Sequence, residues 1–370
     1  MEKHITFDVE EHMTGQTVEK VLRTALGLTK RQISRAKFQA DGIRKNGVQC
    51  RTTDIVQTSD HIMICIEAAK NDLNHLVSFC EDAHPLEILY EDEDILAVNK
   101  PAGILTHPSG AHYADTLSNQ VSGYFHKKKV SCRVRPIGRL DKETSGIVLF
   151  AKNQVSAQRL QAQRESGILH KQYIAIVMGS FSDDTSASSN TAWHTVCFPI
   201  RKTADHPLRM EAITAFGSSF VPESADFVTP LAGMTTLLSA VTHYQVLYRS
   251  PDWSIVTLKL DTGRTHQIRV HMKALGHPLL GDTLYQKTFP ADSLSEQPVF
   301  HRTALHAWKI QFRHPFNNAW ISLEAPLPDD FCNCFQNINA LLCILLYETQ
   351  YNTKQRYRIA SELYNIAVFF

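Results

Sequence analysis

A thirteen-residue segment near the middle of the chain, Arg139 to Ala151, joins a polar turn directly to an apolar run. The turn ends at Gly146, and the run Ile-Val-Leu-Phe-Ala that follows is typical of a buried strand. Asp141 would therefore lie in a loop at the end of a strand, where a rigid scaffold often carries chemistry. The same pattern also fits an Asx or ST turn, in which side-chain oxygens bond to nearby main-chain N–H groups. The segment alone leaves both interpretations open.

The length of 370 residues predicts two or three domains, and 43% apolar with 20% charged residues predicts a globular protein. No apolar run approaches membrane-spanning length, and the first residues lack the features of a signal peptide. The eight cysteines lack the paired spacing of a zinc site, so we expect reduced thiols. We therefore expect a cytoplasmic protein, a monomer, with no membrane partner.

Positive charge is concentrated near the N-terminus, although the whole chain has a formal net charge of only +1. Between Gln16 and Arg51 there are nine cations and two acids, which gives this stretch a net charge of +7. Charge at this density is typical of a surface that binds phosphate groups. A solvated helix face is the alternative, and the charge alone does not decide between them.

Periodicity gives this basic stretch a structure. Apolar residues from Val18 to Ala25 repeat at helical spacing, and a second short helix is expected from Ile33 to Lys37. Asn46-Gly47 predicts a type I′ hairpin turn, and a strand is expected at Ile62 to Ile66. The order of these elements from Leu22 to Gly47 resembles the S4-like RNA-binding domain. The resemblance implies contact with structured RNA through Lys30, Arg31, Arg35 and Lys37.

A second domain is expected from residue 85, after a linker at 68–84. Two strands, Leu86 to Tyr90 and Ile95 to Asn99, flank an acidic turn. Strands and helices are expected to alternate from there to about Leu327, and Asn153 is expected to cap a helix. These patterns predict an α+β fold with a large mixed, mainly antiparallel sheet flanked by helices. The further strands are expected at 147–152, 173–178, 244–248 and 255–260.

Two more segments of this domain carry candidate functional residues. His170 to Gly179 puts Tyr173 at the start of a strand, and a helix is expected after Thr265, which is a plausible N-cap, with Gly276 just beyond its end. The apolar positions of this helix fall on one face and the cations on another, so Arg269 is expected to point away from the core.

The three segments, taken in order, resemble the pseudouridine synthases of the RluA and RluD type, which isomerise uridine in ribosomal or transfer RNA. The resemblance covers residues 85–330 and the S4-like domain at 1–67, and it leaves 331–370 as an extension of unknown role. It implies that Asp141 is the catalytic aspartate, Tyr173 the active-site tyrosine and Arg269 the basic partner of the aspartate. It also implies substrate or RNA contacts by Arg139, Thr144, Arg264 and His266.

These residue types suit the reaction, which breaks a C–N glycosidic bond and forms a C–C bond without redox chemistry. Asp141 could be a nucleophile at the base or sugar, or a base that removes a sugar proton. An Arg in hydrogen-bonding reach would orient it bidentately, and a Tyr ring could stack on an extruded uracil. No cofactor is expected. Metal is not expected either, because His266 and His271 are five residues apart and not four.

Three departures from the family pattern bear on substrate choice. Gly138 stands where His is usual, Leu238 to Val241 replaces a segment that usually carries a cation, and 212–236 is expected to be an inserted loop. Large-subunit ribosomal RNA is the expected substrate by resemblance. Transfer RNA is the first alternative, and a non-catalytic RNA-binding assembly factor is the second.

Overall fold

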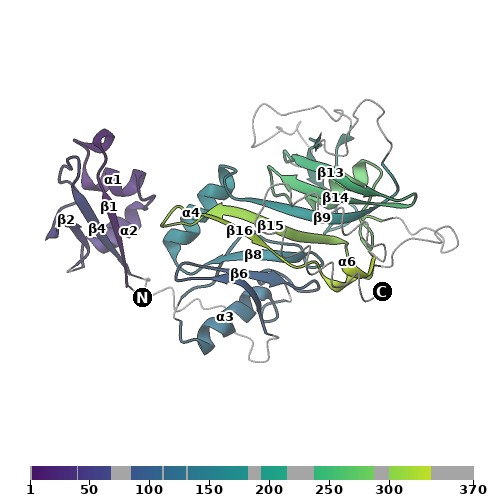
Figure 1. Ribbon diagram of the computed structural model, residues 1–370, viewed down its shortest axis with the longest axis horizontal. Coiled ribbons are helices and arrows are strands. Elements are labelled where there is room, and N and C mark those ends of the chain that lie inside the picture. Colours follow the sequence, from purple (N-terminus) through teal and green to yellow (C-terminus); the bar gives the residue numbers. More distant parts are fainter. Residues whose placement is uncertain are drawn as a thin grey trace, which may run out of the picture.

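The computed structural model describes residues 2–39, 41–67, 85–110, 112–130, 132–181, 193–214, 237–286 and 300–334. The expected linker at 68–84, most of the expected insertion at 212–236 and nearly all of the C-terminal extension lie outside these described residues. Figure 1 shows a small N-terminal module at one end of the molecule and a long twisted sheet that forms the rest.

The N-terminal module has its own sheet, with strand order β1-β4-β2-β3, and its own apolar core. Asn46 and Gly47 have φ of 53° and 79°, as the type I′ turn between β2 and β3 requires. Both expected helices are present, and Thr29 begins the second with a capping box. The first strand, which pairs with β4 along its whole length, was not expected. The elements are β1 (Glu2–Asp8), η1 (Glu11–Met13), α1 (Val18–Thr24), α2 (Lys30–Ala36), β2 (Ile43–Lys45), β3 (Val48–Gln49) and β4 (His61–Glu67).

The large sheet has ten strands in the order β10-β13-β14-β9-β15-β8-β6-β5, with β16 paired to β15 and β7 paired to β8. All its pairs are antiparallel except β15 with β8. The expected large, mainly antiparallel sheet is therefore confirmed. The strands are β5 (Glu87–Glu91), β6 (Ile95–Lys100), β7 (Arg135–Ile137), β8 (Ser145–Ala151), β9 (His170–Met178), β10 (His194–Val196), β13 (Thr242–Arg249), β14 (Trp253–Leu260), β15 (Leu305–Arg313) and β16 (Trp320–Glu324).

The expected alternation of strands and helices holds only as far as β9. From β9 to β14 strands follow one another, and the short pair β11 (Ile200–Lys202) and β12 (Met210–Ala212) forms a separate two-stranded sheet. The helices are α3 (Leu117–Lys127), α4 (Gln154–Glu165), α5 (Gln267–Ala274) and α6 (Asp329–Cys334). Asn153 caps α4 as expected, because its side chain accepts a bond from the N–H of Ser156.

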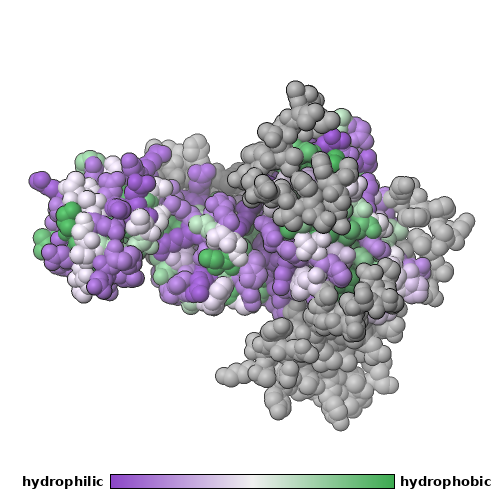
Figure 2. Space-filling model, turned by 90° about the horizontal axis from the view of Figure 1, so that it is seen from above, coloured by the Kyte–Doolittle hydropathy of each residue, from purple (hydrophilic) through white to green (hydrophobic). Residues whose placement is uncertain are grey.

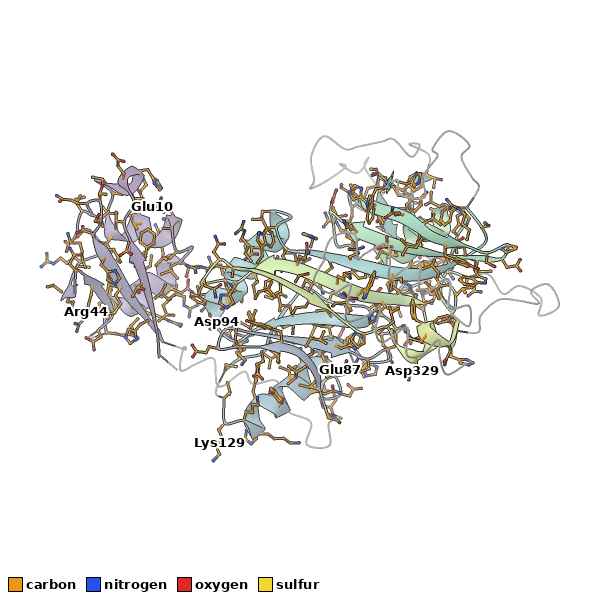
Figure 3. The ribbon with its side chains drawn as sticks, in the orientation of Figure 1. Glu10, Arg44, Glu87, Asp94, Lys129 and Asp329 are labelled. Carbon is orange, nitrogen blue, oxygen red and sulfur yellow. The ribbon has the colours of Figure 1, made fainter. Side chains whose placement is uncertain are left out.

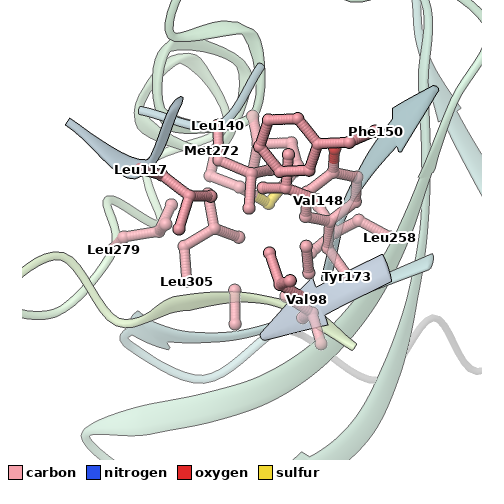
Figure 4. Packing of buried hydrophobic residues seen from close by; sticks show 14 of the residues in the cluster. Val98, Leu117, Leu140, Val148, Phe150, Tyr173, Leu258, Met272, Leu279 and Leu305 are labelled. Carbon is pink, nitrogen blue, oxygen red and sulfur yellow. The ribbon is translucent and has the colours of Figure 1, made fainter. Parts of the chain in front are cut away.

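Helices cover both faces of the large sheet, so its central strands are apolar on both sides. On β8, Val148 and Phe150 pack with α3 and α5, whereas Ile147 and Leu149 pack with α4 on the opposite face. Figure 4 shows the first of these clusters, in which Tyr173 of β9 takes part. Successive side chains of a strand point to opposite faces of the sheet, so every second residue of β8 faces α5.

The two parts of the molecule meet at α4. Val155 of this helix is buried in the apolar core of the N-terminal module. Arg159, one turn further on, donates two hydrogen bonds to the carbonyl oxygen of Leu26 and one to that of Pro315. Its guanidinium carbon also lies 5.1 Å from the ring centre of Phe316. One helix thus contacts both the module and the loop that follows β15.

The residue at the expected domain boundary belongs to the core. Phe331 of α6 is fully buried, and its ring packs edge-on against Phe300. The helix that it belongs to therefore crosses the boundary that the sequence suggested at residue 331. Among the described residues, no helix is both long enough and apolar enough to cross a membrane.

Candidate active site

An open pocket of about 100 Å³ lies where the turn before β8 faces the start of α5. Asp141, Tyr173 and Arg269, the three expected catalytic residues, all line it. The four residues of this domain that were expected to contact the substrate, Arg139, Thr144, Arg264 and His266, line it as well. Side chains that lie far apart in the sequence are thus brought to one place.

The turn that carries Asp141 closes through the main chain. The N–H of Thr144 donates to the main-chain carbonyl oxygen of Asp141 at 3.2 Å. Just before it, Leu140 is bound in both directions by the hydroxyl of buried Thr106, which accepts from its N–H and donates to its carbonyl oxygen. These bonds fix the main chain on both sides of Asp141, and the side chain of Asp141 lines the pocket.

Gly146 has a steric reason to be glycine. Its φ is +112°, and a Cβ built there would lie 2.3 Å from the carbonyl oxygen of Ala307. The close approach occurs where β8 and β15 pair in parallel, with Gly146 opposite Ala307. A side chain at this position would push apart the two strands that meet beside the pocket.

Tyr173 is the fourth residue of β9 and not the first, because the strand begins at His170. Only 8% of it is exposed, and its ring packs in the cluster that faces α5. Burial, together with the negative charge of Asp141, raises the pKa of Tyr173 well above its ordinary value. It is therefore a neutral phenol at physiological pH.

The pairing of Arg269 differs from the expectation. Its bidentate partner is Asp282, whose carboxylate accepts from Nε and Nη2 at 2.7 Å each. The remaining Nη1 lies 3.8 Å from Oδ2 of Asp141, which is a charge contact and too long for a hydrogen bond. Both Arg269 and Asp282 are buried. Asp282 was not predicted as the partner, because it lies thirteen positions after Arg269, beyond the end of α5.

The start of α5 also differs from the expectation. The N-cap is His266 and not Thr265, and His266 adopts a left-handed conformation with φ 57° and ψ 19°. The side chain of His266 makes no capping bond, and Oε1 of Gln267 accepts from the N–H of Arg264 and the hydroxyl of Thr262 in the loop before the helix. Ile268 and Met272 pack in the main core as expected, whereas Arg269, although it is also buried, lines the pocket.

Cations surround the pocket mouth. Arg139 is exposed there, and Arg264 is held by a hydrogen bond from its Nε to the carbonyl oxygen of Ser239. Arg164 of α4 was not predicted as a site residue, because its position on the helix does not indicate what its side chain faces. A Cβ at Gly138 would lie 3.7 Å from its Nη1, and one at Gly263 3.6 Å from its Nη2. Arg164 therefore lies between the two loops that form the pocket.

Lys30, Arg31, Arg35 and Lys37 are exposed on the N-terminal module and lie outside the pocket. Figure 2 shows hydrophilic residues over much of the visible face of this module. Figure 3 shows Arg44, a further cation, on the side of the module that is far from the large sheet.

Comparison with known proteins agrees with this geometry. Residues 94–274 match the RNA pseudouridylate synthase family. The chain is 34% identical over 327 residues to an uncharacterised RNA pseudouridine synthase of Bacillus subtilis, YhcT, which covers 88% of this chain and 94% of that protein. The chain belongs to the RNA pseudouridine synthases. It is therefore an isomerase that converts uridine in RNA to pseudouridine.

Other relatives of this pseudouridine synthase include ribosomal large subunit pseudouridine synthase D of Nitrosomonas europaea. The two are 28% identical over 341 residues, which cover 92% of this chain and 89% of the relative. The structure of human RNA pseudouridylate synthase domain containing 4 is similar, with a TM-score of 0.52 at 22% identity, and covers 68% of this chain and 93% of that one. This likeness agrees with the synthase fold.

Several histidines of the synthase have partners within the protein. His271 is fully buried between the hydroxyl of Thr242 and the carbonyl oxygen of Phe198, and burial lowers its pKa to about 4. His277 bonds through Nδ1 to the carbonyl oxygen of Met178. These side chains bond to separate groups and do not converge on one point.

One cluster in the described residues offers three possible metal ligands, Asp92, Asp94 and His314. It lies away from the pocket, at the end of the sheet where Figure 3 labels Asp94. Asp92 accepts from the hydroxyl of Tyr90 and from the main-chain N–H of Ile95, and it bonds to Nε2 of His314. These bonds give the cluster a structural role in the turn between β5 and β6.

Proposed function

We propose that this synthase modifies a uridine of large-subunit ribosomal RNA, with Asp141 as its catalytic carboxylate. The observation that carries the proposal is the convergence of Asp141, Tyr173 and Arg269 on one pocket. The choice of RNA is supported by the relatives whose names specify the large ribosomal subunit.

The charges at the pocket support a role for Asp141 in bond making or bond breaking. Asp282 engages Nε and Nη2 of Arg269, which leaves Nη1 directed toward Asp141. The positive charge of Arg269 attracts the carboxylate of Asp141, and the distance of 3.8 Å leaves the carboxylate oxygens accessible to a substrate. Asp141 then acts either as a nucleophile on the base or sugar, or as the base that removes a sugar proton.

Tyr173 supplies a surface for the base. Its ring forms part of the pocket wall, and its raised pKa keeps the hydroxyl protonated. A uracil that leaves its stack in RNA can lie against such a ring. The hydroxyl can donate a hydrogen bond to the base or pass a proton while C5 becomes attached to the sugar.

We assign RNA contacts other than those to the uridine base to two cationic surfaces. The first consists of Arg139 and Arg164 at the pocket mouth, both exposed. The second consists of the exposed cations of α2 and its C-terminal end, in a module that we propose is an S4-like domain: Lys30, Arg31, Arg35 and Lys37. Exposed cations of this kind bind phosphates and make binding dependent on salt.

The test is to map pseudouridine in all cellular RNA from a strain that lacks the gene, complemented with different variants. We expect one or more large-subunit positions to lose pseudouridine without the gene and to regain it with wild type. Asp141→Asn should not restore them, whereas Asp205→Asn, which changes an exposed carboxylate, should. Loss of modification in transfer RNA alone would overturn the proposed substrate, and rescue by Asp141→Asn would overturn the proposed role.

The cationic surface on α2 has a separate test. Replacing Lys30, Arg31, Arg35 and Lys37 by Gln should weaken RNA binding and reduce the slope of log affinity against log salt by about three units. Asp141→Asn should keep the wild-type slope, because Asp141 contacts no phosphate in this proposal. An unchanged slope in the four-residue variant would show that this surface does not bind RNA.

A further inference from the structure

His266 stands out in the pocket because its backbone is in a conformation that most residues avoid. Its φ of 57° and ψ of 19° are left-handed, a conformation that is strained at a residue other than glycine. Such strain persists where the surrounding structure holds it, and it is concentrated at functional sites. The side chain of His266 makes no capping bond to α5, so its imidazole is left for other contacts.

A hydrogen-bond chain fixes the imidazole of His266. The main-chain N–H of Met210 donates to Oη of Tyr285 at 2.8 Å, and this Oη lies 2.9 Å from Nδ1 of His266. Burial raises the pKa of Tyr285 to about 12, so its hydroxyl keeps its proton. Within the described part of the chain, Nδ1 of His266 is the acceptor that the structure offers to this O–H.

This chain selects one tautomer of the ring. If Nδ1 accepts from Tyr285, a neutral imidazole must carry its hydrogen on Nε2. Burial lowers the pKa of His266, and Arg269 and Arg139 act in the same direction against the opposing charges of Asp141 and Asp282. The ring is therefore neutral near pH 7. Tyr285 is held at its hydroxyl by two segments, through the N–H of Met210 and through the ring of His266, so the position of this hydroxyl is fixed.

The Nε2 atom faces the reacting region. It lies 4.0 Å from Oδ2 of Asp141, which is too far for a hydrogen bond. The Nε2–H group is thus available to a third group that enters the pocket beside Asp141. A planar base placed against Tyr173 would bring a carbonyl oxygen to this part of the pocket wall, since His266, Tyr173 and Asp141 all line it.

We propose that His266 is a catalytic residue whose Nε2–H donates a hydrogen bond to a carbonyl oxygen of the uracil, and that Tyr285 is the positioning residue that keeps the hydrogen on Nε2. The proposal deepens the proposed function and rests on it. When the C1′–N1 bond breaks, the electron pair stays on the base and the negative charge spreads to its carbonyl oxygens. A fixed neutral donor stabilises that charge, and no proton leaves His266.

The first test needs no RNA. Nitrogen-15 NMR of the histidine rings in the intact protein should show His266 in the Nε2–H tautomer, identified by the loss of its signals in His266→Asn. In Tyr285→Phe the Nδ1–H tautomer should become populated, because the O–H donor is gone while the ring beneath Arg269 remains. A wild-type ring that carries its hydrogen on Nδ1 would overturn the proposal.

The second test is kinetic, with total RNA from a strain lacking the gene as the substrate. Asn tolerates the left-handed backbone but has no group at the place of Nε2. His266→Asn should lower kcat on the order of 100-fold with KM within threefold, as for removal of a preorganised donor. His266→Gln, whose amide nitrogen can replace Nε2, should recover part of the loss.

The variant Tyr285→Phe shows whether Tyr285 acts by positioning His266 or only by its packing. Tyr285→Phe should lower kcat by about threefold to tenfold in the wild-type background, which corresponds to about 1 kcal/mol. It should cause no further loss in the His266→Gln background, because an amide has no tautomer to be fixed. Equal losses in both backgrounds, or a wild-type kcat in His266→Asn, would overturn the proposal. Failure of the wild-type protein to form pseudouridine would instead contradict the proposed function, and the NMR result would then decide the role of Tyr285.

Discussion

The ammonium group of Lys100 donates a hydrogen bond to the carbonyl oxygen of Lys142, the residue after Asp141, at 3.1 Å. Lys100 is fully buried and also donates to the carbonyl oxygens of Pro101 and Ile104. The main-chain N–H of Gly103 reaches the same oxygen of Lys142. The loop that carries Asp141 is therefore tied on one side to the end of β6, and through Leu140 to Thr106 on the other.

Lys100 should make stability depend on pH. Burial lowers its pKa to about 7, whereas an unfolded lysine titrates near 10.5. Between these values the unfolded chain binds more protons than the folded one, so the free energy of unfolding rises with pH by at most about 1.4 kcal/mol per unit. Below pH 7 both states are charged and this dependence disappears. Urea unfolding between pH 7 and 9 should show a smaller rise for Lys100→Met than for wild type.

Lys171→Met is the matched control for this prediction. Lys171 is a second lysine whose pKa burial lowers to about 7, but it bonds to Ile147 and not to the loop of Asp141. It should show the same change in pH dependence, while Lys100→Met alone should lower kcat. Equal pH slopes in Lys100→Met and wild type would contradict the prediction.

Gly146→Ala should destabilise the protein by about 3 kcal/mol, because the added methyl group meets the backbone of Ala307 and not a side chain that can move. Gly276→Ala separates this clash from backbone strain. Gly276 also has a positive φ, of 86°, but a Cβ there meets nothing within 4 Å. Its expected cost is only about 1 kcal/mol. Thermal unfolding of both variants measures the difference, and similar losses would rule out the clash.

Asp282→Asn should destabilise the protein by about 4 kcal/mol, since it leaves the buried guanidinium of Arg269 without its charged partner. Nη1 of Arg269 would also lose its fixed direction, so kcat should fall. Glu211→Gln is the control, because it removes the partner of Arg201 in a pair whose side chains are 32% and 42% exposed. That loss should be at most about 1 kcal/mol. Denaturant unfolding that gives the two variants equal losses would argue against the buried pair.

Arg164→Gln should raise KM for RNA about threefold to tenfold and reduce the salt slope of binding by about one unit, with little change in kcat. The reason is its exposed position between the loops of Gly138 and Gly263 at the pocket mouth. Lys127→Gln removes one exposed cation from α3 and should leave binding unchanged. Filter binding over a salt series measures both, and a wild-type slope for Arg164→Gln would exclude a phosphate contact.

The sequence predicts much of this fold because several signals are local. The turn at Asn46-Gly47, the cap at Asn153 and the apolar run after Gly146 each depend on a few adjacent residues, and each is confirmed. Gly138, in place of the usual His, has a φ of +78° that suits glycine. The three motifs that converge on the pocket were likewise recognisable from their order.

What the sequence did not reveal depends on distant contacts. The strand β15 lies between β9 and β8 in the sheet, although five strands, β10 to β14, and the helix α5 stand between β9 and β15 along the chain. Lys100 directly follows the expected strand Ile95 to Asn99, and nothing near it in sequence indicates the three carbonyl oxygens to which it donates. The pairing of Arg269 with Asp282 and not with Asp141 likewise depends on how a loop folds back. The sequence therefore indicates which residues have side chains suited to catalysis, whereas contacts between distant segments decide which groups these side chains bond to.

The helix α4 carries Arg159 against the N-terminal module and, five residues later, Arg164 beside the pocket. Both side chains extend from one rigid element, whose rise between them is about 7.5 Å. If the module binds phosphates as proposed, an RNA that contacts the module and the pocket at once presents its uridine at a set spacing from those phosphates. One residue inserted in α4 between Arg159 and Arg164 would turn one of these contacts by about 100° around the helix axis relative to the other, so that α4 could no longer hold the module and the pocket mouth together.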